Sequence, residues 1–187
     1  VYAKGKKKQG EFEEVNFIDK WLRNNPKQRK YEDSGIYPPD VNVPEGHFNT
    51  WRKFDMELIE DYEEKKEERD ELFHHIKILC NHEEAVYEYF MKWIAQMIQY
   101  PSMKTVTPQL ISKQGAGKGT LIRLLSKMLG AKKVFEARDP SNDVWGKFNG
   151  RMADAYLVVL DELSIKDTID SMGKIKGLQT EPTMMVN

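Results

Sequence analysis

The glycine-rich segment from Ser112 to Thr120 constrains the fold of this chain more than any other part of its sequence. It reads Ser-Lys-Gln-Gly-Ala-Gly-Lys-Gly-Thr and lies between a predicted short strand, residues 109–111, and apolar residues at helical spacing over residues 121–129. A strand, a glycine loop and a helix in this order let backbone N–H groups and a helix N-terminus bind phosphate. The sequence therefore predicts a phosphate-binding loop (P-loop) in an α/β domain.

Each position of this loop has an expected role. Glycines let the backbone curl so that successive N–H groups face the phosphates, and the Lys118 ammonium reaches the β- and γ-phosphates. Two positions depart from the usual G-x-x-x-x-G-K-[ST] pattern, because Ser112 replaces the first Gly and Gly119 occupies the Ser/Thr position. The hydroxyl that binds magnesium is therefore expected one residue later, from Thr120. The predicted nucleotide contacts are Gln114, Gly115, Ala116, Gly117, Lys118, Gly119 and Thr120.

A second motif argues against the alternative that the glycine-rich segment is only an accidental start of a helix. Residues 156–160, Tyr-Leu-Val-Val-Leu, form the continuous apolar run of a central parallel strand, and Asp161 and Glu162 follow at its carboxyl end. In this Walker B arrangement Asp161 holds Mg²⁺, and Glu162 polarises the attacking water as a general base. A hydrolase needs such a base and a nucleotide kinase does not. The pair therefore favours hydrolysis of a nucleoside triphosphate, with Lys118 and Glu162 as catalytic residues.

The rest of the chain predicts an arm and helices ahead of the α/β domain. Prolines and glycines punctuate residues 17–54, which favours extended segments and turns, and a charged run over residues 57–70 suits a solvated helix or connector. Apolar residues at helical spacing over residues 71–98 predict two helices joined near Asn81. Another short strand is expected at residues 134–136. The predicted domains are an extended arm, residues 1–55, a helical domain, residues 56–104, and an α/β domain, residues 105–187.

Composition narrows the class of protein. The formal net charge of −1 gives no bulk electrostatic argument for a nucleic-acid partner, and no apolar run approaches the roughly 20 residues of a membrane helix. The single cysteine, Cys80, cannot form an internal disulfide, which favours a reducing intracellular compartment over secretion. A zinc site of Cys80 with His74, His75 and His82 is rejected, because no fourth ligand of suitable spacing follows and adjacent histidines on a helix point to different faces.

The motifs resemble a known group of proteins. Residues 115–121 resemble the Gly-x-Gly-Lys-Gly-Thr-Leu form of Walker A in the superfamily-3 helicase domain of virus- and phage-type primase-helicases, a group that includes the poxvirus NTPase-primase. Residues 148–150 with residues 157–162 are similar to the Walker B region of that group. Upstream, residues 48–54 resemble its Asn-x-Trp-x-x-Phe element. The resemblance covers nearly the whole chain from about Phe17.

The resemblance implies an ATP-dependent DNA helicase of the AAA+ type in viral genome replication. It implies an α/β P-loop NTPase (AAA+-like) fold whose parallel sheet core is partial here, preceded by a helical accessory domain and an extended N-terminal arm. The implied ligands are ATP and Mg²⁺, and the implied partners are single-stranded or forked DNA and further copies in a hexameric ring. Such a protein would act in the host cytoplasm or nucleus. Its sensor residue, DNA-contacting hairpin and trans-acting arginine are expected beyond Asn187, so weak turnover is expected of this chain.

Two other functions stay open. An adenylate-kinase-like nucleotide kinase shares the Gly-Ala-Gly-Lys-Gly-Thr string, although such an enzyme needs an arginine-rich lid and only Arg123, Arg138 and Arg151 follow the loop. A non-catalytic, ATP-dependent assembly module would use Glu162 only structurally. Lysines could contact DNA, although ordinary surface lysines are the simpler explanation. The candidates are Lys4, Lys6, Lys7, Lys8, Lys132, Lys133, Lys174 and Lys176.

Overall fold

The chain forms two compact units. The computed structural model describes residues 2–6, 12–24, 27–146, 149–152, 155–161, 163 and 165–181. The N-terminal unit comprises Val1–Tyr37 and Val41–Trp51, and the main unit comprises Pro38–Asp40 and Arg52–Asn187. Each unit is described by itself below. The domain boundaries that the sequence suggests at residues 55 and 104 stay predictions.

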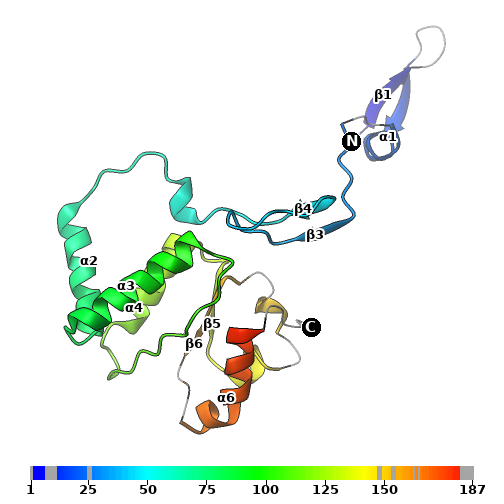
Figure 1. Cartoon of the computed structure of the whole chain (residues 1–187). Coiled ribbons are helices and arrows are strands. Elements are labelled where there is room, and N and C mark those ends of the chain that lie inside the picture. Colours follow the sequence, from blue (N-terminus) through cyan, green and yellow to red (C-terminus); the bar gives the residue numbers. More distant parts are fainter. Residues whose placement is uncertain are drawn as a thin grey trace. The chain divides into compact units, whose positions relative to one another are not determined.

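In its described residues the N-terminal unit contains two small strand pairs and one helix (Figure 1). Strands β1 (Tyr2–Lys6) and β2 (Phe12–Asn16) are antiparallel and lead into helix α1 (Phe17–Asn24), whereas β3 (Asp33–Gly35) and β4 (His47–Asn49) are parallel. The helix differs from the predicted extended arm. Residues 11–25 contain no Pro or Gly, and the Asn16 side chain accepts a hydrogen bond from the Ile18 N–H at 3.0 Å, which favours a helix start.

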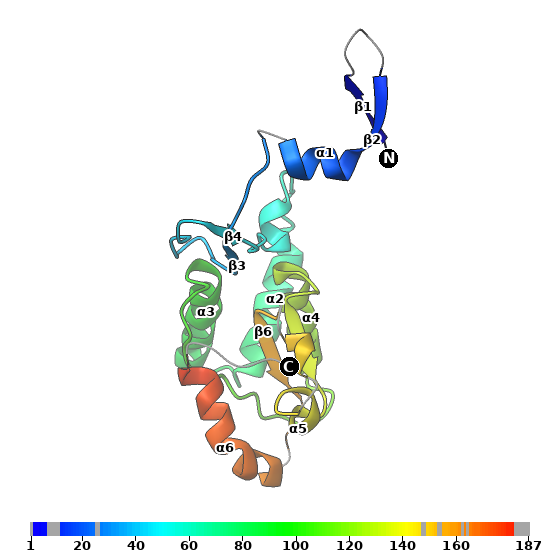
Figure 2. The same ribbon diagram turned by 90° about the vertical axis from the view of Figure 1, so that its right-hand side faces the viewer.

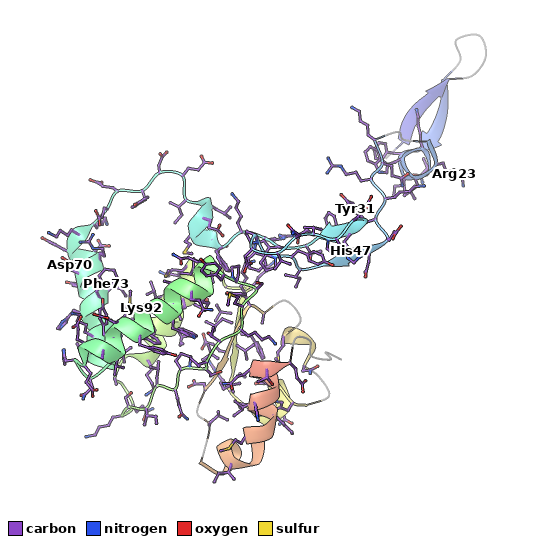
Figure 3. All side chains as sticks on the ribbon, in the orientation of Figure 1. Arg23, Tyr31, His47, Asp70, Phe73 and Lys92 are labelled. Atoms are coloured by element: carbon purple, nitrogen blue, oxygen red, sulfur yellow. The ribbon has the colours of Figure 1, made fainter. Side chains whose placement is uncertain are left out.

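The Asn-x-Trp-x-x-Phe element has a structural role at its first residue. Asn49 Oδ1 accepts hydrogen bonds from the N–H groups of Tyr37 (3.0 Å) and Trp51 (2.8 Å), and Asn49 Nδ2 donates to the Tyr37 carbonyl (2.8 Å). The Tyr37 hydroxyl lies 2.6 Å from His47 Nδ1 on the same strand pair. Figure 3 labels Tyr31 and His47 in this region. Asn49 thus ties the end of β4 to the segment that follows β3.

The main unit begins with helices, as the apolar periodicity predicts. A short 3-10 helix, η1 (Asp55–Leu58), precedes α2 (Lys66–Leu79) and α3 (Glu84–Gln99). Asn81 and His82 have positive φ angles of 54° and 58°, so the chain turns between the two helices where the sequence places a junction. Figure 3 labels Asp70 and Phe73 on α2 and Lys92 on α3. The prediction of two helices joined near Asn81 is confirmed.

The part after the glycine-rich segment alternates helices and strands. In the described residues its sheet has two parallel strands, β5 (Val134–Ala137) and β6 (Leu157–Leu160), whose register runs from Val134 opposite Leu157 to Ala137 opposite Leu160. In Figures 1 and 2 helix α4 (Lys118–Leu129) lies beside this strand pair, and α4 contacts β5. The predicted helix over residues 121–129 and the predicted strands at residues 134–136 and 156–160 are confirmed. The central, fully buried position predicted for the strand at residues 156–160 is wrong, because within the described residues β6 pairs only with β5 and its residues are half-buried. The elements are α4 (Lys118–Leu129), β5 (Val134–Ala137), α5 (Pro140–Asp143), η2 (Gly150–Met152), β6 (Leu157–Leu160) and α6 (Ile165–Thr180).

The strand predicted at residues 109–111 is wrong. These residues have no regular secondary structure, and within the described residues β6 pairs with β5 and with no other strand. Instead, side chains of neighbouring helices hold the segment before the loop: Trp93 Nε1 donates to the Val106 carbonyl at 3.0 Å, and Gln179 Nε2 donates to Thr107 Oγ1 at 2.6 Å. A three-residue segment cannot form a strand without a partner edge, and Ile111 is 85% exposed.

Buried apolar residues fix α4 against the rest of the main unit. Leu121, Leu125 and Leu129 follow one helical face and are almost fully buried. A second cluster joins β5 to the turns that follow it, with Phe135, Ala137, Val144 and Met152 at its centre. Because Leu121 lies in the first turn of α4, its burial anchors the end of the helix that carries the glycine-rich loop. Among the residues the structure describes, no helix is both long and apolar enough to span a membrane.

Candidate nucleotide-binding site

The glycine-rich loop is open toward solvent at Gly115 and Gly119. Gly115 and Gly117 have φ angles of +81° and +92°, a region that glycine adopts far more readily than other residues. A Cβ built on Gly115 or Gly119 would meet no atom within 4 Å. Helix α4 begins at Lys118, so the N–H groups of Lys118 and Gly119 have no carbonyl partner within the helix, whereas those of Thr120 and Leu121 donate to the Gly117 carbonyl. The loop therefore has free space and directed N–H donors where a phosphate would bind.

The Lys118 ammonium is folded back over the start of the loop. Its Nζ donates to Ser112 Oγ at 2.8 Å, to the Ser112 carbonyl at 3.2 Å and to the Lys113 carbonyl at 3.4 Å. Ser112 stands at the position of the first Gly in the usual pattern, and its hydroxyl supplies the shortest of these contacts. Negatively charged phosphate oxygens are stronger acceptors for an ammonium than these neutral oxygens. The Lys118 side chain is therefore placed to exchange the oxygens of Ser112 and Lys113 for the oxygens of a phosphate.

One cavity brings the predicted site residues together. It has a volume of about 1500 Å³, which exceeds the roughly 300–1,000 Å³ of common ligand pockets. Asp161 lies at the carboxyl end of β6, where its N–H donates to the Ala137 carbonyl at 3.0 Å. Glu162 lies outside the described residues, so its place in the site stays a prediction. The predicted residues that line the cavity are Gln114, Gly115, Ala116, Gly117, Lys118, Gly119, Thr120 and Asp161.

The two predicted magnesium ligands differ in their surroundings. Thr120 Oγ1 accepts a hydrogen bond from Arg123 Nη2 at 3.3 Å, so the hydroxyl has a cationic neighbour that opposes a metal ion. Asp161 is exposed beside the cavity. No group of three or more His, Cys, Asp or Glu residues suited to a metal occurs in the part of the chain that the structure describes. Magnesium commonly uses one or two protein ligands with phosphate oxygens and water, so Thr120 and Asp161 suit it only beside a nucleotide.

The structure adds two residues that sequence reasoning missed. Glu136 on β5 is exposed and lines the cavity, while its neighbours Phe135 and Ala137 are buried on the other face of the strand. Alternation along this strand could have placed Glu136 on the open face. His75 on α2 lies with its Nε2 3.1 Å from the Gly117 carbonyl oxygen. Nothing local in the sequence signals this contact, because 42 positions separate the two residues.

The lysines considered for DNA contact do not form one equivalent set. Lys133 Nζ donates to the Arg52 carbonyl at 2.6 Å and lies 5.7 Å from the centre of the Phe54 ring, and burial lowers the pKa of its ammonium. Lys174 Nζ lies 5.7 Å from the centre of the Trp145 ring. The Lys133 ammonium thus packs against its own chain, which makes Lys133 a poorer candidate for DNA contact. Lys132 and Lys176 are exposed, Lys4 and Lys6 lie on β1, and Lys7 and Lys8 lie outside the described residues.

Comparisons with known proteins relate this chain to a phage replication protein. A family of unknown function (DUF5906) matches residues 110–187, which include the glycine-rich loop and β6. A DNA primase-polymerase of Nitratiruptor phage NrS-1 is 30% identical over 105 residues, which cover 52% of this chain and 14% of that protein. The chain is therefore similar to a phage-type primase-polymerase, and it spans only a small part of that relative.

A solved structure has a similar fold over nearly the whole chain. The apo structure of the NrS-1 C-terminal region matches with a TM-score of 0.62 and 19% sequence identity, over 97% of this chain and 46% of that one. At this identity the match shows a shared fold. The fold of the described residues therefore occurs within a region about twice as long in that phage protein.

Proposed function

We propose that this chain binds ATP with Mg²⁺ at the glycine-rich loop and belongs to an ATP-driven DNA helicase of superfamily 3. One observation carries the proposal: the open loop at the start of α4, the Lys118 side chain and Asp161 all line one cavity. This is the set of groups that a P-loop NTPase uses to bind phosphates and magnesium. The AAA+-like sheet core, the hexameric ring and the DNA partner are parts of the same proposal.

The relatives support a role in replication. The name of the similar phage protein is DNA primase-polymerase, which describes synthesis on a DNA template. Such synthesis needs a single-stranded template, and an ATP-driven helicase supplies one by separating the strands. A helicase module would therefore serve the same process as the activity that the relative's name describes.

The chain's own residues have defined tasks in this proposal. Lys118 leaves the oxygens of Ser112 and Lys113 and donates to the β- and γ-phosphate oxygens, while the first amides of α4 bind the same phosphates. Asp161 and Thr120 hold Mg²⁺, which neutralises phosphate charge when bound. Glu162, which follows Asp161, removes a proton from the attacking water. Asp161 thus serves binding, and Glu162 serves hydrolysis.

Nucleotide binding is tested by titrating a fluorescent ATP analogue with Mg²⁺ into the chain and into its Lys118→Ala variant. Loss of a charge-assisted contact is expected to weaken affinity roughly tenfold or more. Lys127→Ala is the matched control, because Lys127 lies exposed on the same helix and does not line the cavity. Equal affinity for the wild-type chain and Lys118→Ala would refute the proposed function.

Hydrolysis needs a separate experiment on the full-length protein. Glu162→Gln keeps the size of the side chain and removes its basicity, so nucleotide should still bind while turnover falls by at least about a hundredfold. ATP hydrolysis is measured with and without single-stranded DNA. Turnover that is unchanged in Glu162→Gln would remove this residue from the role of base and favour a non-catalytic module.

A further inference from the structure

The imidazole of His75 packs directly on the glycine-rich loop. His75 Nε2 lies 3.1 Å from the Gly117 carbonyl oxygen. Because a carbonyl oxygen only accepts hydrogen bonds, Nε2 carries the proton and donates it. A Cβ built on Gly117 would lie 2.2 Å from His75 Cε1, so the ring occupies the space that any other side chain at position 117 would need. Helix α2 therefore contacts the loop at its last residue before α4.

The Gly117 carbonyl receives two more hydrogen bonds from the start of α4. The N–H groups of Thr120 and Leu121 lie 3.0 and 3.3 Å from this oxygen. A planar trans peptide joins Gly117 to Lys118, so the Gly117 carbonyl and the Lys118 N–H point in opposite directions. Holding the oxygen against α4 and His75 therefore directs the Lys118 N–H out of the helix end. Donors on the carbonyl also polarise the peptide and strengthen that N–H as a donor.

We propose that His75 is a positioning residue for phosphate binding. By donating to the Gly117 carbonyl it holds the Lys118 amide in the orientation that binds phosphate, and it makes nucleotide affinity depend on the placement of α2. The inference rests on the proposed function of the loop as a nucleotide site. It gives α2 a part in that site, although α2 lies far from the loop in sequence and carries none of the loop's motif.

The neighbouring histidine provides an internal comparison. His74 is exposed, and its ring faces His82 with 6.0 Å between ring centroids. The two adjacent histidines thus point to different faces of α2, as helical geometry requires. Only His75 reaches the loop, so a change at His74 alters the same helix without altering the contact.

The test compares the dissociation constant of a fluorescent ATP analogue with Mg²⁺ for the wild-type chain, His75→Ala, His75→Gln and His74→Ala. His75→Ala should bind roughly three- to tenfold more weakly, the effect of about one hydrogen bond. His75→Gln should recover most of the affinity, because its amide Nε2 can donate to the same carbonyl. His74→Ala should bind as the wild-type chain does.

Binding stoichiometry and thermal midpoints, measured in parallel, separate positioning from folding. A purely structural defect lowers the fraction of binding-competent protein and leaves the dissociation constant of that fraction unchanged. An unchanged dissociation constant in His75→Ala, or the same loss in His75→Gln, would overturn the inference while Lys118→Ala still shows a nucleotide site. If Lys118→Ala binds as tightly as the wild-type chain, the proposed function fails, and the inference fails with it.

Discussion

At the scale of single residues, Ser112 is where the loop departs most from the usual pattern. Its hydroxyl lies 2.8 Å from Lys118 Nζ, so the ammonium has a partner before any phosphate arrives. This contact has to break when Lys118 reaches toward a nucleotide. In the proposed nucleotide site the serine would therefore oppose binding to a small extent, in contrast to the glycine that usually stands there.

Replacing Ser112 with Ala should tighten nucleotide binding about two- to fivefold, because an exposed hydrogen bond to a charged group is removed from the free state only. The backbone oxygens of Ser112 and Lys113 still hold Lys118, which limits the gain. The dissociation constant of the fluorescent ATP analogue is the quantity to measure. Weaker binding by Ser112→Ala would show that the hydroxyl contacts the nucleotide instead.

Gly117 is required both for its left-handed backbone conformation and for the space that the His75 ring occupies. A double-mutant cycle separates these two requirements. Gly117→Ala should destabilise the chain by about 1–3 kcal/mol through its left-handed backbone alone, and the clash with His75 adds to this cost. In a His75→Ala background the clash is absent and only the backbone cost remains. Urea unfolding of the four proteins should give a coupling energy of at least about 0.5 kcal/mol. Additive effects would show that the ring moves aside freely.

At the scale of elements, local periodicity identifies α2, α3, α4, β5 and β6, because each carries apolar residues in one regular pattern. It fails for residues 109–111, where the outcome depends on a partner edge that no local pattern records. It also misses α1, because the prolines and glycines elsewhere in residues 17–54 outweigh eight residues without either. Secondary structure is thus predictable here where a segment has its own regular apolar pattern. It is not predictable where a partner strand or a helix cap determines whether the element forms.

One hydrogen bond ties α3 to the segment that enters β6. The Tyr156 hydroxyl donates to the Met97 carbonyl, and the Tyr156 ring packs on Phe54 with 5.1 Å between ring centroids. Burial raises the pKa of this hydroxyl above its ordinary value of 10, and the charge of Asp40 raises it further. The link therefore depends on a phenol that stays protonated in the folded chain.

Tyr156→Phe should lower the free energy of unfolding at pH 7 by about 1 kcal/mol, since the Met97 carbonyl loses its donor. The pH dependence has a definite sign. A folded pKa above the unfolded one gives stability that is complete below pH 10 and is lost as the pH rises above 10. The difference between wild type and Tyr156→Phe in urea unfolding should therefore shrink from pH 7 to about pH 10.5. A constant difference would contradict the raised pKa.

At the scale of the whole molecule, the candidate site combines residues that sequence motifs identify with residues that only the fold brings to the cavity. The loop residues and Asp161 carry motifs, so the sequence places them, and they line one cavity. His75 and Glu136 carry no motif: His75 reaches the loop across 42 positions, and Glu136 reaches the cavity because β5 pairs with β6. Glu162, the proposed base, lies outside the described residues, so its role rests on sequence alone.

Contact with DNA would be a property of the whole surface, and the lysines of the main unit differ in what they can contribute. Lys132 and Lys176 are exposed, whereas Lys133 donates to the Arg52 carbonyl and is partly buried. A lysine that contacts phosphate releases a counterion, so the logarithm of the affinity falls linearly with the logarithm of the salt concentration. Each phosphate contact on a single strand adds about 0.7 to that slope.

The double variant Lys132→Ala/Lys176→Ala should weaken binding of single-stranded DNA and reduce the salt slope by up to about 1.4, because two phosphate contacts are lost. Lys133→Ala removes the same charge from the neighbouring position and should lower stability while leaving the slope unchanged, since its ammonium is held by Arg52 and Phe54. Fluorescence anisotropy between about 50 and 200 mM salt measures both quantities. If the wild-type chain binds DNA with an affinity that salt does not change, phosphate contacts by these lysines are excluded, and the DNA-binding surface has to be sought elsewhere.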